Sequence, residues 1–162
     1  MNTLGKQLPQ KLRMTSSGFT LIELMVTIAV LAIIVGMAAP SISTQLANQR
    51  VKSTAATLAN ALKEAKAESI IRRQSLTLTY NESSSPKVIE IKNLSSSVIA
   101  SYNYDAKTSI KSTPSEITFQ PSKRVGTAVT YTICDSNKNV TPRQVVVNKI
   151  ANINNQTGGT CS

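Results

Sequence analysis

The sequence has no histidine and no tryptophan, and only 4% of its 162 residues are aromatic. Without histidine, Ser-His-Asp catalysis, Cys-His catalysis and histidine-ligated zinc are excluded. So few aromatic rings also argue against a broad base-stacking platform for nucleic acids. Acidic residues are scarce as well, because 8 Asp and Glu stand against 18 Lys and Arg and give a formal net charge of +10. This excess of positive charge is typical of proteins that meet nucleic acids or membrane surfaces.

The chain length suggests one modest domain and excludes a large multidomain enzyme. No carboxylate pair, phosphate-binding glycine loop or activated nucleophile stands out in the sequence. The serine runs at 83–85 and 95–97 are better explained as turns than as catalytic groups. We therefore expect no enzymatic activity, no cofactor and no metal.

One long apolar run stands near the amino terminus. Residues 19–39 read FTLIELMVTIAVLAIIVGMAA and contain a single charge, Glu23. As a helix with about 1.5 Å rise per residue, this run would be roughly 30 Å long, which matches the hydrocarbon core of a bilayer. A buried core helix is the alternative, but it would need a polar face that this run lacks.

The segment before the apolar run carries Lys6, Lys11 and Arg13 and no acidic residue. Positive charge on this flank keeps it in the cytoplasm and directs the rest of the chain outward. An ordinary secretory signal would be cleaved after the apolar run, where small residues are present. The run is too long for such a signal, and a glycine stands at its front edge instead.

This front edge carries a specific motif. Gly18-Phe19-Thr20-Leu21-Ile22-Glu23 resembles the processing site of type IV prepilins and type II secretion pseudopilins. The resemblance implies cleavage after Gly18 by a prepilin peptidase, N-methylation of the new amino terminus at Phe19, and assembly through Glu23.

The physical chemistry of Glu23 fits an assembly role. An ionised carboxylate near the bilayer interior costs several kcal/mol and is seldom kept without a partner. In pilin-like filaments the expected partner is the Phe19 amine of the same or a neighbouring subunit, paired in low-dielectric surroundings. Alternatively, Glu23 lies near enough to the interface to be hydrated cheaply.

A helical pattern continues past Pro40, which would either end the helix or kink it. Continuation is favoured because no glycine or proline occurs between residues 41 and 73. Apolar residues step by three and four along this stretch, as on one face of a helix. They are Val51, Ala55, Leu58, Leu62 and Ala65. We therefore expect one helix from about Thr20 to about Arg73, whose second half packs into a globular domain.

After Arg73 the pattern changes to alternation of apolar and polar residues, which is typical of strands. Strands are expected at 76–80, 88–91, 98–104, 117–119, 129–133 and 145–147, with turns at 81–86, 93–97, 113–114, 121–126 and 135–142. A long helix followed by about six short strands predicts an α+β domain with an antiparallel sheet packed on the helix.

The globular part is similar to one branch of the pilin superfamily, the GspH/FimT family, which includes minor pseudopilins of type II secretion and FimU- or FimT-type minor pilins. The matching segments are 58–62, 65–69, 76–78, 131–135 and 143–147. The resemblance covers nearly the whole chain after Gly18. It is less specific than the leader motif, because short Ala/Lys/Glu helices and Val-rich strands are common.

The two cysteines, Cys134 and Cys161, both lie on the expected exported side, where oxidation is permitted. A disulfide between them would stabilise the fold by roughly 3 to 4 kcal/mol on the loop-entropy account. Two free thiols or a metal pair are the alternatives, but no other soft ligand exists to complete a metal site.

The basic residues raise the question of DNA binding. Lys123, Arg124, Arg143 and Lys149 lie in the C-terminal third, where cations on neighbouring loops can meet DNA phosphates. Solvated surface charge is the simpler explanation. FimT-type DNA receptors carry a Gly-Arg-x-Arg type motif after the last Val-rich strand, whereas this chain has Asn-Lys-Ile-Ala-Asn at 148–152 and lacks both arginines. The departure makes the receptor function the less favoured of the two.

Taken together, the sequence predicts a cleaved leader at 1–18, a transmembrane and filament-core helix at 19–40, and a periplasmic or extracellular GspH-like domain at 41–162. The predicted function is that of a minor type IV pilin or type II secretion pseudopilin near the filament tip, with a pilus-associated DNA receptor as the alternative. Its expected partners are the prepilin peptidase, other major and minor pilins or pseudopilins, and the inner membrane before assembly. DNA is the less favoured partner.

Overall fold

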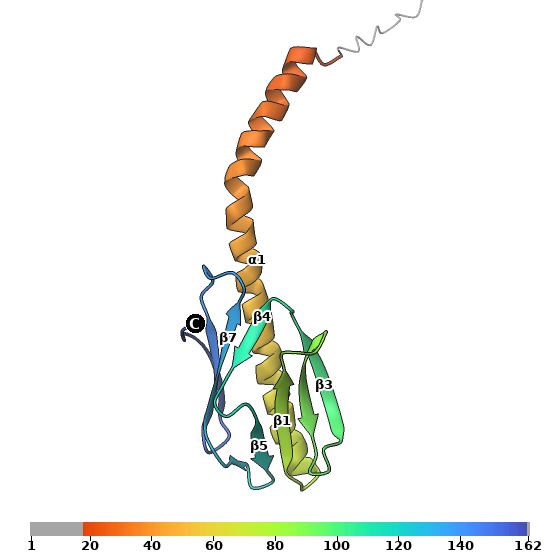
Figure 1. The fold of residues 1–162 in the computed structure, drawn as a ribbon, viewed down its shortest axis with the longest axis vertical. Coiled ribbons are helices and arrows are strands. Elements are labelled where there is room, and N and C mark those ends of the chain that lie inside the picture. Colours follow the sequence, from red (N-terminus) through yellow and green to blue (C-terminus); the bar gives the residue numbers. More distant parts are fainter. Residues whose placement is uncertain (1–17, 162) are drawn as a thin grey trace, which may run out of the picture. The chain divides into compact units, whose positions relative to one another are not determined.

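The computed structural model describes residues 18–161, and for residues 38–41 it describes the course of the helix but not the side chains. The chain divides into two compact units, one that ends at Ala39 and one that begins at Pro40. A single long helix, α1 (Leu21–Ile71), contributes to both (Figure 1).

Helix α1 begins and ends with recognisable caps. The Thr20 hydroxyl accepts a hydrogen bond from the Glu23 backbone N–H at 3.3 Å, which is the usual N-cap contact. At the other end, Arg73 has a φ of 53°, the left-handed conformation that commonly follows the last helical turn. Pro40 lies inside the helix, so the expected continuation past this proline is observed.

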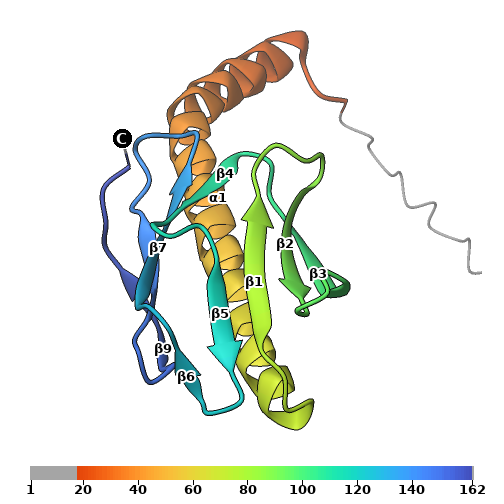
Figure 2. The same ribbon diagram turned by 60° about the horizontal axis from the view of Figure 1, so that its bottom comes forward.

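Within residues 18–161, nine strands follow the helix and form two antiparallel sheets. One sheet has the order β3-β2-β1-β5-β6 and the other β4-β7-β8-β9. The strands are β1 (Leu76–Asn81), β2 (Lys87–Lys92), β3 (Val98–Tyr104), β4 (Thr108–Lys111), β5 (Ile117–Gln120), β6 (Arg124–Val125), β7 (Val129–Asp135), β8 (Arg143–Val147) and β9 (Ile153–Thr157). Figure 2 shows β1 and β5 side by side along the helical half that belongs to this unit.

The core lies between this half of α1 and the inner faces of both sheets. The expected helical stripe is fully buried, from Val51 to Ala65. It packs in one cluster with alternate residues of the strands, among them Leu76, Phe119 and Tyr131. Each of these strands therefore buries one face against the helix, as the period of two requires.

The α+β architecture, with a long N-terminal helix and antiparallel sheet, is as the sequence predicts. All six expected strands are present, but β4, β6 and β9 were not expected. Strand β6 lies within the expected turn at 121–126 and pairs with β5 only through Phe119–Val125 and Gln120–Arg124. The sequence predicts one sheet, whereas the structure has two. In the second of them, the unexpected strands β4 and β9 extend the pair β7–β8 on its two sides.

Candidate functional site

The first candidate site is the segment that contains the predicted processing point. Gly18, Phe19 and Thr20 precede the first turn of α1 and are exposed. Apart from its chain neighbours, a side chain at position 18 would meet no atom of the described residues within 4 Å. The rest of the expected leader, residues 1–17, lies outside the described residues. The described part of the segment therefore leaves the Gly18–Phe19 bond uncovered.

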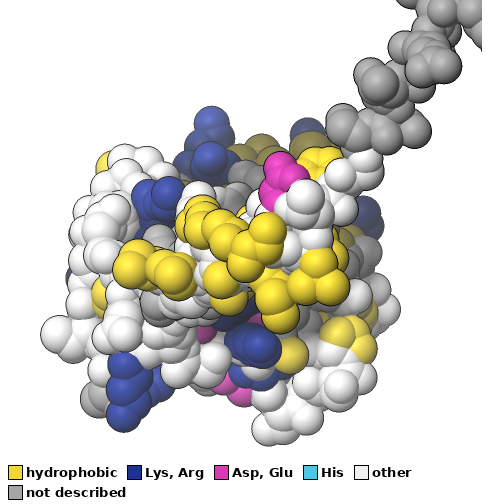
Figure 3. Space-filling model, turned by 90° about the horizontal axis from the view of Figure 1, so that it is seen from above, with side chains coloured by type: hydrophobic (Ala, Val, Ile, Leu, Met, Phe, Trp, Pro, Cys, Tyr) yellow, Lys and Arg dark blue, Asp and Glu magenta, His cyan; other side chains and the backbone are white. Residues whose placement is uncertain are grey.

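The apolar side chains of this segment have no covering partner among the residues that the structure describes. Its large hydrophobic residues between Phe19 and Met37 are exposed to between 50% and 80% of their surface. Figure 3 shows hydrophobic side chains gathered on the face seen there. Apolar surface of this extent, uncovered in one molecule, is typical of an interaction surface for protein or lipid.

The length and composition of the helix can also be compared with those of a membrane-spanning helix. Within the described part of the chain, no single helix is by itself long and apolar enough to span a bilayer. The segments Leu21–Met37 and Ile42–Ile71 meet the criteria only when they are taken together.

Glu23 is the acidic residue of the first helical turn. Its carboxylate is exposed among the apolar side chains and forms no ion pair within residues 18–161. At a helix N-terminus a carboxylate is favoured by the helix dipole. If the surrounding apolar surface becomes buried, the same carboxylate needs a cationic partner from outside the described chain.

The second candidate site is the basic surface, and the structure divides its four predicted residues into two groups. Lys123 and Arg124 lie at the turn between β5 and β6, and Lys149 lies at the turn between β8 and β9. The Val125 backbone N–H donates to the Lys149 carbonyl at 3.2 Å, so these two turns are adjacent. Arg143 starts β8, at the opposite end of that strand from Lys149.

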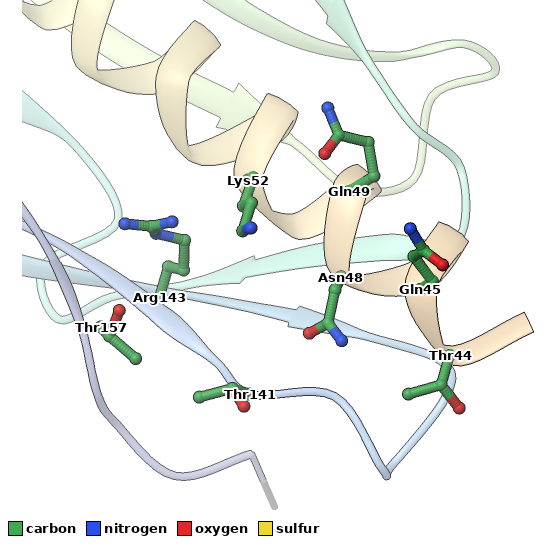
Figure 4. Close-up of a pocket in the computed structure, with 8 residues that line it drawn as sticks. All are labelled: Thr44, Gln45, Asn48, Gln49, Lys52, Thr141, Arg143 and Thr157. Atoms are coloured by element: carbon green, nitrogen blue, oxygen red, sulfur yellow. The ribbon is translucent and has the colours of Figure 1, made fainter. Parts of the chain in front are cut away.

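Arg143 lines a separate polar pocket between α1 and the β8–β9 pair, shown in Figure 4. Lys52 of α1 lines the same pocket. The expected basic patch is therefore one cluster of three cations together with a distant arginine that has different neighbours.

The disulfide that the sequence suggested is present in the structure, where Cys134 and Cys161 are bonded with their Cα atoms 5.9 Å apart. Cys134 is buried in β7, whereas Cys161 is exposed. The bond therefore fastens the tail that follows β9 to the middle of the second sheet. Within the described residues, no group of three or more Cys, Asp or Glu side chains is placed to hold a metal ion.

An ion pair between α1 and β7 was not predicted from the sequence. The Arg50 guanidinium donates to both carboxylate oxygens of Asp135, with Nε–Oδ2 at 2.9 Å and Nη2–Oδ1 at 3.0 Å. It thereby joins α1 to the strand that carries Cys134. Asp105 also approaches Arg50, at 3.8 Å. The two bonded residues stand 85 positions apart, so no spacing in the sequence indicates the pair.

The surroundings of Asp135 shift its pKa in opposing directions. Burial alone raises the pKa of this carboxyl, but the hydrogen bonds from Arg50 and from the Asn137 backbone N–H outweigh it and lower the pKa below its usual value. The same bond to Asp135 raises the pKa of Arg50. Both groups therefore remain charged and joined over the ordinary pH range.

Elsewhere on the first sheet, Tyr102 donates a hydrogen bond to the Glu64 carboxylate of α1. This bond, assisted by desolvation, raises the pKa of Tyr102 to about 12. Each sheet is thus joined to the helix by a polar contact to a carboxylate, in addition to the apolar core.

A long N-terminal helix with an uncovered apolar segment, packed on antiparallel sheets, defines a pilin-like protein. The pattern of the prokaryotic N-terminal methylation motif matches residues 13–39. The pattern of the family described as type II transport protein GspH matches residues 54–150, which is more than half of the chain. The chain therefore belongs to the GspH family, a family of structural pilins and pseudopilins.

Solved structures show the same fold at low sequence identity. The type IV minor pilin FimU of Pseudomonas aeruginosa is 17% identical, with a TM-score of 0.59, and the match covers 68% of this chain and 99% of that chain. The minor pseudopilin EpsH of the type 2 secretion system of Vibrio cholerae is 11% identical, with a TM-score of 0.55 and the same coverage. No curated protein matches the chain significantly.

Proposed function

We propose that the chain is a minor subunit of a type IV pilus or a type II secretion pseudopilus. In this proposal a prepilin peptidase cleaves after Gly18, the new amino terminus at Phe19 is methylated, and the subunit waits as a single-pass protein of the inner membrane. Its N-terminus faces the cytoplasm and its globular unit the periplasm. It then joins the filament near the tip, where minor subunits initiate assembly.

One observation carries this proposal. An apolar helical segment with one unpartnered carboxylate, Glu23, directly follows an exposed glycine. A buried apolar environment would leave Glu23 uncompensated, so the free amine that cleavage creates at Phe19 is a fitting partner for it. In the uncleaved chain that nitrogen is an uncharged peptide group, so processing and assembly are chemically linked.

The test is a pair of glycine substitutions. Gly18→Val should leave the full-length precursor in the membrane, because a bulky residue at this position blocks the peptidase. Beyond the neighbouring residues and the helix's own backbone, neither Gly18 nor Gly36 has an atom of the described chain within 4 Å of where a side chain would stand, so the two positions are equally open. Gly36→Val is therefore the matched control and should be processed normally.

The readout is the mass of the membrane-bound protein and the sequence of its amino terminus. A normal mature terminus at Phe19 in the Gly18→Val variant would contradict the proposed cleavage. A terminus beyond Gly36 in the parent would instead indicate an ordinary signal peptidase.

The basic cluster favours a second function, that of a pilus-associated DNA receptor. Lys123, Arg124 and Lys149 meet on two adjacent turns, as a phosphate-binding surface requires. Against it, the 148–152 segment is a tight turn in which the Asn148 side chain accepts the Asn152 backbone N–H at 2.8 Å, and it offers only one cation.

A mobility-shift titration of the full chain in non-ionic detergent distinguishes the two functions. A DNA receptor should bind duplex DNA with a steep salt dependence and lose affinity on Lys149→Gln. In cells, loss of surface filaments on deletion supports the filament subunit, whereas intact filaments with lost DNA uptake support the receptor.

A further inference from the structure

A polar pocket of about 770 Å³ lies between the start of the globular unit's helical segment and the second sheet. Figure 4 shows Asn48, Gln49 and Lys52 projecting from α1, with Arg143 and Thr157 from β8 and β9 across from them. All of these residues belong to the unit that begins at Pro40. The pocket is therefore a feature of the globular unit alone.

The pocket is positive and rich in hydrogen-bond donors. Its two charged lining residues, Lys52 and Arg143, are both cations, and its other lining residues are threonines, asparagine and glutamines. Amide and hydroxyl groups can donate to an anion without adding charge of their own. Such a lining fits a carboxylate or a similar small anionic group.

Arg143 adds an unsatisfied donor. Its Nε is buried and has no hydrogen-bond partner within the described chain. A buried donor without a partner is destabilising, and more so when the group is charged. Because Arg143 lines the pocket together with Lys52, an anion bound there would offer its guanidinium an acceptor, whereas a neutral apolar occupant would offer none.

The chain itself has few carboxylates to offer to such a pocket. Most are already engaged in ion pairs within the described residues: Glu68, Glu82, Glu90, Asp105 and Asp135. Two copies also repel each other, because the formal net charge of +10 remains positive, at 15 − 8 = +7, after loss of Lys6, Lys11 and Arg13 with the leader. A second copy of this chain is thus a poor source of the anion.

A nucleic-acid backbone is also a poorer fit than a protein carboxylate. Phosphates contact proteins through cations spread along a surface, and affinity grows with their number. Here two cations converge on one pocket, and the three-cation cluster around Lys149 lies at the other end of β8. The pocket therefore suits one or two carboxylates presented together.

We propose that this pocket receives an acidic segment of a different filament subunit. The proposal rests on the proposed function. The helical residues that line the pocket, between Thr44 and Lys52, come shortly after the exposed apolar segment through which we propose assembly. A neighbour that packs on that segment is then selected by its carboxylates, which hydrogen-bond to Lys52, Arg143 and the amides that line the same pocket.

The test measures binding of a labelled peptide of eight glutamates by fluorescence anisotropy. The protein is the full, unprocessed chain in non-ionic detergent at low salt. A peptide of eight glutamines and a thymidine octanucleotide are the comparison probes. The glutamate peptide should bind, the glutamine peptide should not, and added salt should weaken binding.

Two matched variants locate the binding. Lys52→Gln should weaken binding of the glutamate peptide about tenfold, since one hydrogen bond to a charged group is lost. Lys149→Gln removes the same charge at the other end of β8 and should change affinity less than about twofold. Arg143→Lys keeps the charge but removes Nε, and should also weaken binding, with tyrosine fluorescence as the check that the fold is intact.

Three results would overturn the proposal. The first is equal affinity for the glutamate and glutamine peptides. The second is an equal loss of affinity for the glutamate peptide from Lys52→Gln and Lys149→Gln. The third is tighter binding of the octanucleotide than of the glutamate peptide, if Lys52→Gln abolishes it. The last of these would assign the pocket to nucleic acid. None of them bears on cleavage after Gly18, which is measured separately in the membrane, so the failure of one proposal can be told from the failure of the other.

Discussion

Replacing Cys161 by serine removes the disulfide with Cys134 at a position where the side chain is exposed. The buried sulfur of Cys134 stays in place, so packing in β7 is unchanged. The loss of stability then reports almost entirely on the covalent constraint. The bond joins residues with a sequence separation of 27. For a loop of about this length, the chain-entropy relation predicts a loss of about 3 to 4 kcal/mol in the free energy of unfolding.

The native fold should survive this change. Strand β9 remains paired to β8 from Arg143–Thr157 to Val147–Ile153. The Gly158 backbone N–H also donates to the Pro142 carbonyl at 3.1 Å. These contacts hold the tail without the disulfide, so the effect arises mainly in the unfolded chain, which gains freedom.

Urea unfolding followed by tyrosine fluorescence provides the assay. The 4 tyrosines lie between residues 80 and 131, so the signal reports on the globular unit even in the full chain. The midpoint should fall for Cys161→Ser and for the parent in thiol reductant. Cys134→Ser should lose more, because it also buries a hydroxyl in place of sulfur. Equal midpoints for Cys161→Ser and the oxidised parent would refute the reasoning.

Three further changes test other parts of the chain. Glu23→Val should insert into the membrane more readily, because a charge is removed, yet give fewer filaments in sheared-cell fractions; normal filament yield would argue against its assembly role. Because the folded-state pKa of Asp135 lies below its usual value near 3.8, the stability it contributes is present above that pH and is lost as the pH falls through the lower, folded-state pKa. Urea midpoints between about pH 6 and about pH 2, which extends below the usual carboxyl pKa, should therefore vary less for Asp135→Asn than for the parent, and identical pH profiles would contradict this. Leu58→Ala, in the buried stripe, should cost about 2 to 5 kcal/mol, whereas Leu46→Ala, exposed on the same helix, should stay within about 0.5 kcal/mol when both are measured by urea unfolding; equal losses would mean that the stripe is not the core.

The long helix was predictable because two independent patterns mark it. The apolar run after Gly18 and the buried stripe from Val51 to Ala65 each have the period or length of a helix, and they join without a break. Five of the six expected strands have at least two buried residues at alternate positions in the structure. The exception is β3, in which only Tyr104 is buried.

The unexpected strands lack alternating apolar residues in their sequences. Strand β9 has one apolar residue, Ile153, and lies at the sheet edge with most of its side chains exposed, so hydrogen bonding to β8 defines it rather than burial. In β4 a buried position is occupied by Thr108, whose hydroxyl is 3.0 Å from that of Thr54 on α1. A polar residue that is buried through a distant partner gives no sign of burial in its own sequence.

The candidate sites also differ in whether the sequence alone predicts them. The processing motif is contiguous, so Gly18, Phe19 and Glu23 are readable from the sequence. The Arg50–Asp135 pair and the pocket of Lys52 and Arg143 join α1 to the second sheet across long stretches of chain. Only the packing of helix on sheet brings them together. The extended strand β8 separates Arg143, at its start, from Lys149, which follows its end.

The two proposed surfaces would have to divide the work of assembly between them. Apolar contacts are non-directional and scale with buried area, so the exposed segment after Gly18 supplies affinity for any similar helix. Choice among subunits that share such a helix requires groups that penalise a wrong neighbour. A buried, unpartnered Arg143 Nε does so, because a neighbour without a carboxylate leaves it unsatisfied. If both proposals hold, we expect this subunit to lie next to an acidic neighbour in the filament rather than next to a copy of itself, because most of its own carboxylates are engaged within the described residues.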